Sequence, residues 1–134
     1  MKFLLDRYMP VRQAHALNAL SSPEHSFVHL HDKFGADHPD EEWIRALANE
    51  GGWVLLSGDA RTGSSPHECS AWRDSGLAIF CLSRGWSKMT AVEQHARLAV
   101  LLPKIVEKAE RASPGCGYTI LVNGTIEPLF SKTA

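Results

Sequence analysis

The sequence predicts one α/β domain over residues 1–134: a three-layer sandwich with a mainly parallel sheet and a small C-terminal hairpin. Three observations predict this class. A chain of 134 residues is long enough to bury one sizeable core. Short apolar runs alternate four times with segments of helical period. The helical segments have about ten residues or more, which suits crossovers between parallel strands.

Residues 1–60 carry three predicted strands and two predicted helices. Their apolar runs are short and bounded by polar or turn residues, as is typical of buried strands. Pro10 and Pro39 open the helices, since proline suits the first helical turn, and Gly51-Gly52 closes the second helix. In chain order we expect a strand at 2–5, a helix at 11–20, a strand at 25–30, a polar loop at 31–38, a helix at 40–49 and a strand at 53–56.

Residues 61–134 are predicted to add two helices, a fourth strand and the hairpin. Gly76 ends the first of these helices, and Pro103 kinks the second because proline removes a helical hydrogen bond. Asn123-Gly124 suits a type I′ turn between two strands. In chain order we expect a helix at 66–75, a strand at 77–82, a loop at 83–89, a helix at 90–112 and hairpin strands at 118–122 and 125–128.

Composition and charge exclude several classes of protein. Hydrophobic residues make up 44% and charged residues 22% of the chain, which is ordinary for a folded soluble domain. The 14 basic and 15 acidic side chains nearly cancel, so bulk attraction to a polyanion is not indicated. Three cysteines without a CxxC pair exclude a thiolate zinc ribbon and favour a reducing compartment. The longest apolar run, residues 98–102, is far below the roughly 20 residues of a membrane span, so we expect a cytoplasmic protein with no membrane segment.

Acidic residues follow the predicted strands at one edge of the sheet. Asp6 ends the first strand, Asp40 opens the helix that follows the second, and Asp59 comes directly after the third. In a parallel α/β sheet these positions share the edge at which ligands bind. At 100° per residue, Asp40 falls on the apolar stripe of its helix, Glu41 lies to one side and Glu42 nearly opposite. We therefore expect Asp40 to point inward, Glu41 to assist and Glu42 to be solvated.

Three inward carboxylates repel one another and need a compensating cation. Oxygen ligands without thiolates suit Mg²⁺ or Mn²⁺, and such an ion can activate water and clamp a phosphodiester. Each acid alone also has an ordinary role as a helix cap or turn residue. Their shared edge favours the metal site, with Asp6, Asp40 and Asp59 as its ligands.

Three short segments occur in a fixed order within residues 1–86: Phe3-Leu4-Leu5-Asp6 followed by Pro10, then Asp40-Glu41-Glu42-Trp43-Ile44, then Val54-Leu55-Leu56-Ser57-Gly58-Asp59. Together they resemble the PIN-like domain of VapC-type toxins. The resemblance implies a Mg²⁺-dependent endoribonuclease, often the toxin of a toxin–antitoxin pair. It also implies that Asp6, Asp40 and Asp59 bind the metal and catalyse hydrolysis, and that the Ser57 hydroxyl orients the last of them.

One position departs from that pattern. Many PIN nucleases carry a further acid shortly after the third-strand aspartate, where this chain has Arg61-Thr62-Gly63-Ser64. Either Glu68 or Asp37 replaces it, or the site holds one metal ion rather than two. The alternative function is a degenerate PIN-like domain that binds RNA or a protein partner without cutting.

Basic and aromatic side chains near the predicted edge are candidates for RNA contact. Trp86 either stacks on a base or packs over the sheet edge. Arg7 and Arg61 lie next to predicted site acids, where each either holds a phosphate or pairs with a carboxylate. The basic candidates for phosphate contact are Arg7, Arg12, Arg61, Arg84 and Lys88.

The helix at 90–112 carries a broad apolar face. Its apolar residues include Val92, Leu98, Leu101, Leu102, Ile105 and Val106. This face either meets a partner, as a homodimer or with an antitoxin segment, or is buried within a compact core.

Other chemistries have weaker support. His29 and His31 lack an HxxxH helical pair or a cysteine cluster, so we expect hydrogen-bonded or solvated histidines rather than a transition-metal site. An aspartate-nucleophile phosphatase needs an acid two residues after Asp6, where Tyr8 stands. A receiver domain needs an acidic pair after the first strand and a lysine ending a later strand, and residues 82–84 supply no lysine.

Overall fold

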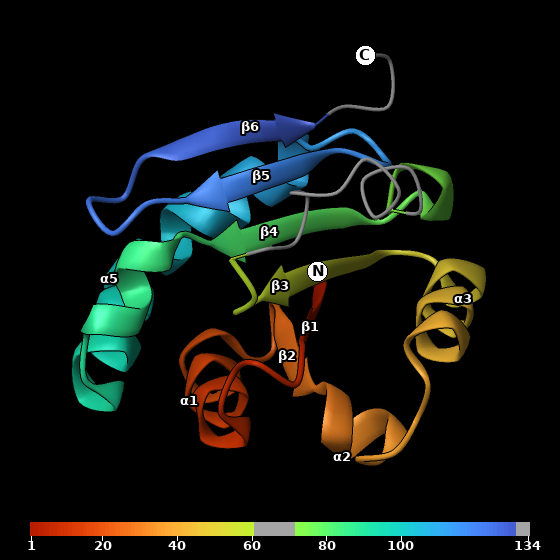
Figure 1. Ribbon diagram of the computed structural model, residues 1–134, viewed down its shortest axis with the longest axis horizontal. Helices are drawn as coiled ribbons and strands as arrows, with labels where there is room; N and C mark the ends of the chain where they lie inside the picture. The colour runs from red at the N-terminus through yellow and green to blue at the C-terminus, as the bar shows by residue number, and fades with distance from the viewer. Residues whose placement is uncertain (61–71, 131–134) are drawn as a thin grey trace.

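The computed structural model describes residues 1–60 and 72–130; residues 61–71 and 131–134 lie outside the described part of the chain. A six-stranded sheet with the order β2-β1-β3-β4-β5-β6 forms its centre (Figure 1). Neighbouring strands are parallel from β2 to β5, and β6 runs antiparallel to β5. The strands are β1 (Lys2–Leu5), β2 (Ser26–His29), β3 (Trp53–Ser57), β4 (Ala78–Leu82), β5 (Gly117–Ile120) and β6 (Ile126–Phe130).

Helices cover both faces of the sheet. Helices α1 (Val11–Ser21) and α5 (Ala91–Arg111) pack on one face, and α2 (Leu30–Phe34) and α3 (Asp40–Glu50) pack on the other (Figure 1). Side chains alternate along β1, so Phe3 and Leu5 join one core cluster while Leu4 joins the other. The predicted three-layer α/β sandwich with a C-terminal hairpin is therefore confirmed.

Two short helices occur where loops were expected. The predicted loop at 31–38 is wrong in its first part, because α2 begins at Leu30. The His29 ring caps this helix by accepting the His31 N–H at 3.0 Å. The predicted loop at 83–89 contains the 3₁₀ helix η1 (Arg84–Lys88). Helices of five residues are too short to give a periodic pattern in the sequence.

The other predicted helices agree with the structure where it describes them. Residues 72–75 are helical, as expected for the end of the helix at 66–75, and its earlier part lies outside the described residues. Helix α5 begins with a capping box formed by Thr90 and Glu93 and continues through Pro103. Neither α5 nor another helix of the described segments has both the length and the apolar character needed to cross a membrane.

The hairpin between β5 and β6 has a different turn from the predicted type I′. A type I′ turn needs positive φ at both central residues, but φ is positive at Gly124 (94°) and not at Asn123. The Leu121 carbonyl accepts the Gly124 N–H, and the Leu121 N–H is donated to the Thr125 carbonyl. This is a three-residue loop in which a glycine bulge follows a tighter turn.

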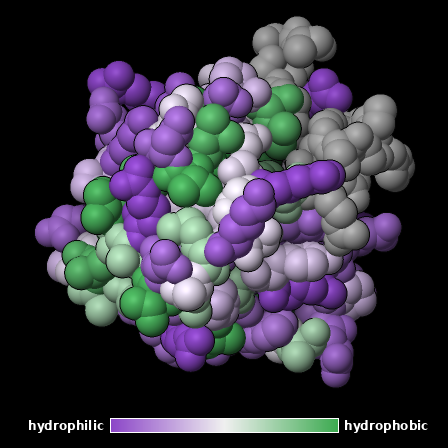
Figure 2. Space-filling view, turned by 60° about the vertical axis from the view of Figure 1, so that its left-hand side comes forward, coloured by the Kyte–Doolittle hydropathy of each residue, from purple (hydrophilic) through white to green (hydrophobic). Residues whose placement is uncertain are grey.

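Most of the apolar face of α5 is buried inside the protein. Leu98, Leu101, Leu102, Ile105 and Val106 belong to the core, while Val92 is 78% exposed. On the side of the molecule that carries α1 and α5, exposed apolar side chains are interleaved with polar ones (Figure 2). The core thus accounts for the broad apolar face, and a partner on this helix stays a prediction.

Replacing Gly124 with alanine should lower the free energy of unfolding. A non-glycine residue with positive φ costs about 1–2 kcal/mol, and an added Cβ would lie 3.0 Å from Leu101 Cδ2. Urea unfolding of Gly124→Ala measures the loss. Glu127→Ala, at an exposed position on β6, is the control and should change stability by less than about 0.5 kcal/mol. Equal stability of the two variants would contradict this account of the turn.

Candidate functional site

The Asp6 carboxylate lies at the carboxyl end of β1, where the strand register brings it next to the end of β3. Leu5 pairs with Leu56, and the Asp6 N–H is donated to the Leu56 carbonyl at 3.2 Å. The next residue of β3 is Ser57, and its hydroxyl donates to Asp6 Oδ2. Asp6 is only 7% exposed. The parallel pairing of two buried strands therefore fixes this acid.

Two backbone N–H groups bind the other oxygen of the same carboxylate. Gly58 and Tyr8 each donate to Asp6 Oδ1 at 3.1 Å. Gly58 is required here, because an added Cβ would lie 2.7 Å from the Tyr8 carbonyl oxygen. The two chain segments that follow β1 and β3 are thus in direct backbone contact around Asp6.

Ser57 joins Asp6 to Asp59. Its oxygen accepts the Asp59 N–H at 3.1 Å while its hydroxyl donates to Asp6. The sequence predicted that Ser57 orients Asp59; in the structure it contacts the backbone of Asp59 and the carboxylate of Asp6. Asp59 also lies near enough for its charge to act on the Asp6 carboxyl.

Burial raises the pKa of Asp6 above its ordinary value of 3.8, and the negative charge of Asp59 raises it further. Hydrogen bonds from Ser57, Gly58 and Tyr8 act in the opposite direction without cancelling the rise. A divalent cation would offset both the cost of burial and the repulsion. Asp6 and Asp59 supply oxygen donors only, and Mg²⁺ commonly takes one or two carboxylates and keeps several waters. These two residues therefore fit the implied ion.

Asp40 is placed differently from the prediction. It opens α3 at the same edge of the sheet, but its side chain is 63% exposed rather than directed inward. Its Oδ1 accepts the Trp43 indole N–H at 2.9 Å and the Arg7 guanidinium at 2.5 Å. The helical phase correctly predicted that Asp40 lies on the same side of α3 as the buried Trp43. In the first turn of α3, however, that side is open to solvent at Asp40. Arg7 accordingly pairs with a carboxylate, one of its two predicted roles.

Convergence of three acids is not seen in the part of the chain that the structure describes. Among residues 1–60 and 72–130, no three histidine, cysteine, aspartate or glutamate side chains form a group that could hold a metal ion. Glu41 is exposed, and so is Glu42, which pairs with His38 at 3.1 Å. Asp37 is also exposed. The candidates Glu68 and Arg61 lie outside the described residues.

The predicted RNA contacts near η1 divide into buried and exposed side chains. Trp86 is 2% exposed and donates its indole N–H to the Ile120 carbonyl at 2.9 Å. Stacking of a base on an open Trp86 ring is therefore wrong, and the residue packs over the sheet edge instead. Arg84 and Lys88 are exposed at the two ends of η1, and Arg12 is exposed on α1.

Sequence reasoning missed two supports of the edge. The sequence pattern gives Gly58 no role beyond its place in the segment 54–59, whereas in the structure its N–H binds Asp6. His29 is buried and its Nε2 hydrogen-bonds the Met9 carbonyl at 2.7 Å, which ties the segment after β1 to the end of β2. His29 is thus a hydrogen-bonded histidine, as expected, but nothing local in the sequence indicates that its partner is Met9.

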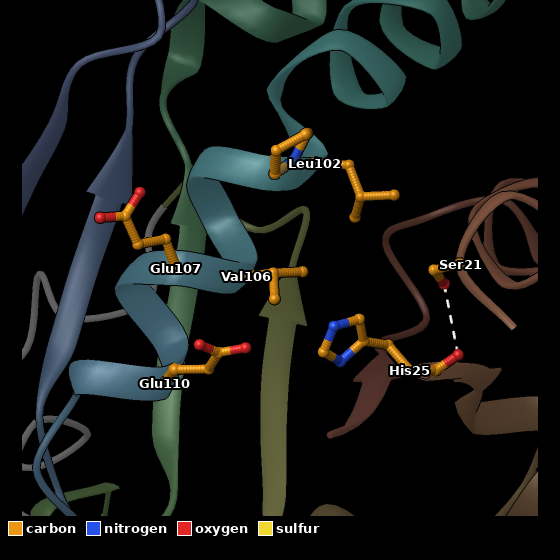
Figure 3. Close-up of a pocket in the computed structure, with 7 residues that line it drawn as sticks. Ser21, His25, Leu102, Val106, Glu107 and Glu110 are labelled. Atoms are coloured by element: carbon orange, nitrogen blue, oxygen red, sulfur yellow. Dashed lines mark hydrogen bonds between the residues drawn. The ribbon is translucent and has the colours of Figure 1, made fainter. Parts of the chain in front are cut away.

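Two of the cavities in the described part of the chain lie at opposite edges of the sheet. One is lined by Ser21 and His25 near the start of β2 and by Leu102, Val106 and Glu110 of α5 (Figure 3). It lies at the amino edge of the sheet, away from Asp6 and Asp59. The other is lined by residues that follow β1, β3 and β4, at the carboxyl edge. Of these two cavities, the one at the carboxyl edge adjoins Asp6 through Tyr8 and Gly58.

Replacing Asp6 with asparagine should reveal the cost of its burial as a pH dependence. Because the pKa is raised in the folded state, the penalty is absent below the ordinary pKa and complete above the raised pKa. Stability of the native chain relative to Asp6→Asn should therefore fall as pH rises through that window. A tenfold change in the ionisation constant is worth about 1.4 kcal/mol. Urea unfolding in EDTA across a pH series measures it, and a native chain that gains stability relative to Asp6→Asn as pH rises would contradict it.

Comparison with known families agrees with this architecture. A family model described as a PIN like domain matches residues 1–84, which include β1, β3, β4 and the edge acids. Searches of curated proteins and of solved structures find no match. The family match spans more than half of the chain, and PIN-like domains are generally nucleases. The chain belongs to the PIN-like domain family.

Proposed function

We propose that the protein is a nuclease that hydrolyses RNA phosphodiesters at the carboxyl edge of its sheet with Mg²⁺ or Mn²⁺. The observation that carries the proposal is the Asp6 carboxylate, buried beside Asp59 and held by Ser57, Gly58 and Tyr8. Burying a carboxylate near a second one costs free energy, and such a cost is typical of functional sites.

Asp6 and Asp59 would hold the cation. When bound, the cation would make a water molecule more acidic and offset the charge that develops on the phosphate oxygens. Ser57 and the two N–H groups keep Asp6 in one orientation, so the one lone pair that they leave, on Oδ2, faces a defined direction. His29 fixes the segment after β1 through the Met9 carbonyl.

Arg7 has a second role in this proposal. Its guanidinium neutralises Asp40 in the protein alone, and a phosphate group offers it a competing partner. Transfer of Arg7 to the phosphate would release Asp40 toward the cation. This exchange would make Asp40 a third acid of the site only when a substrate is bound.

Arg7→Gln should strengthen binding of Mn²⁺ and weaken binding of RNA. An exposed ion pair is worth about 0.2–1 kcal/mol, so we expect an increase of about two- to fivefold in Mn²⁺ affinity by calorimetry. Arg12→Gln removes the same charge from α1, where no described acid pairs with it, and serves as the control. An equal change in both variants would assign the effect to net charge rather than to Asp40.

RNA cleavage itself tests the proposed function. Purified protein with single-stranded RNA should cut in Mg²⁺ or Mn²⁺ and stop in EDTA. Asp6→Asn and Asp59→Asn should each reduce cleavage by about a hundredfold or more, as loss of a metal-site group does. Glu42→Gln, an exposed change on α3, should leave the rate unchanged. Cleavage that persists in Asp6→Asn would show a contaminant and contradict the proposal.

A binding module without catalysis is the second candidate function. Two observations favour it. The described residues contain no group of three acids that could hold a metal ion, and Asp40 already forms an ion pair with Arg7. RNA binding without cleavage under the conditions above would support it. A toxin role, an antitoxin partner and a homodimer stay predictions that rest on the resemblance and on α5.

A further inference from the structure

The cavity at the carboxyl edge adjoins the proposed catalytic acid. Its volume is about 310 Å³, and Tyr8 and Gly58 are among its lining residues. The N–H groups of the same two residues bind the Asp6 carboxylate. A chemical group of the substrate that binds in the cavity would therefore lie close to a phosphate bound beside Asp6.

The inner wall of the cavity is apolar and fixed. Met9, Leu82 and Trp86 line it, and all three belong to the hydrophobic core. The Trp86 indole N–H is committed to the Ile120 carbonyl, so the ring cannot turn without losing that bond. A rigid apolar wall of this kind, with little open surface, suits the edge of a flat ring.

Two polar side chains that line the cavity, Gln94 and Ser87, offer hydrogen-bond acceptors. Gln94 donates its Nε2 to the Trp86 carbonyl at 2.6 Å, which leaves its side-chain oxygen as an acceptor. Ser87 donates its hydroxyl to the Arg84 carbonyl at 2.8 Å, which leaves its lone pairs. Acceptors of this kind match the exocyclic amino group of a nucleobase.

One cation lies at the cavity. Of the described lining residues only Arg84 is charged, and its side chain makes no ion pair with another described residue. An unpaired guanidinium is a favourable partner for a phosphate oxygen. Apolar wall, acceptors and cation together match the parts of a nucleotide.

We propose that this cavity binds a single nucleobase of the RNA strand, with Arg84 on the phosphate attached to it. The inference rests on the proposed function and names the part of the substrate that selects the cleavage position. Bases with an exocyclic amino group bind better than uracil, because the acceptors of Gln94 and Ser87 are satisfied.

Calorimetry in EDTA with three probes tests the base contact. Cytidine 5′-monophosphate should bind more tightly than uridine 5′-monophosphate, and ribose 5-phosphate, which has no base, should bind most weakly. Equal binding of ribose 5-phosphate and the nucleotides would overturn the proposal, because only the phosphate would then be recognised. Equal binding of the two nucleotides would overturn the preference for an amino group.

Variants of η1 test the location. Arg84→Gln should weaken cytidine 5′-monophosphate binding about tenfold, the value of one hydrogen bond to a charged group. Lys88→Gln removes the same charge from the other end of η1, outside the cavity lining, and should leave binding unchanged. Ser87→Trp, at an exposed position, should fill the cavity and abolish binding while an unchanged unfolding curve shows that it folds. Equal losses in Arg84→Gln and Lys88→Gln would overturn the proposal in favour of general charge attraction.

Failure of this inference and failure of the nuclease are distinguishable. If the protein binds nucleotides in EDTA but does not cleave RNA in Mg²⁺, the base-binding role of the cavity is supported and the proposed nuclease activity is contradicted. The opposite result is that the protein cleaves RNA, binds none of the three probes and keeps its cleavage pattern in Ser87→Trp. This result would overturn the proposed base-binding role of the cavity and leave the proposed nuclease activity in place.

Discussion

The burial of the Asp6 carboxylate between the ends of β1 and β3 is the constraint on which the functional edge depends. A carboxylate that is 7% exposed needs donors, and Ser57, Gly58 and Tyr8 provide them. These donors come from two separate parts of the chain, so the parallel register of β1 and β3 must form before the acid is stabilised. The geometry of the site therefore forms only when β1 and β3 pair.

The residues around this acid differ in how firmly they are held. Gly58, Ser57 and His29 are fixed by backbone contact or buried hydrogen bonds. Asp40 and Arg7 form an exposed pair, which contributes little to stability and exchanges partners readily. The edge thus combines a buried centre with an exposed charged pair beside it, an arrangement suited to a ligand that brings its own negative charge.

The sequence was sufficient to predict the strands, the layers and the edge at which the acids lie. Apolar runs marked the strands within a few residues, and the ends of the first and third predicted strands placed Asp6, Ser57 and Asp59 at one edge of the sheet. It was not sufficient for features decided by distant contacts. The exposure of Asp40 depends on which segments of the chain cover the first turn of α3, which helical phase does not give. The close approach of Gly58 to Tyr8, and the turn around Asn123, depend on pairing between segments that a local pattern does not connect.

The long helix α5 has a consequence for the modularity of this chain. Residues 1–84 match the family, yet Leu98, Leu102 and Ile105 of α5 share the core cluster that contains Phe3, Leu5 and Phe80. Strand β5 also pairs with β4 and so covers what would otherwise be an open sheet edge. By itself the matched segment therefore lacks part of the hydrophobic core and one neighbour of β4. During synthesis, one face of its sheet and the edge at β4 would stay exposed until α5 and β5 had left the ribosome. Transplanting residues 1–84 into another protein would carry over an incomplete core.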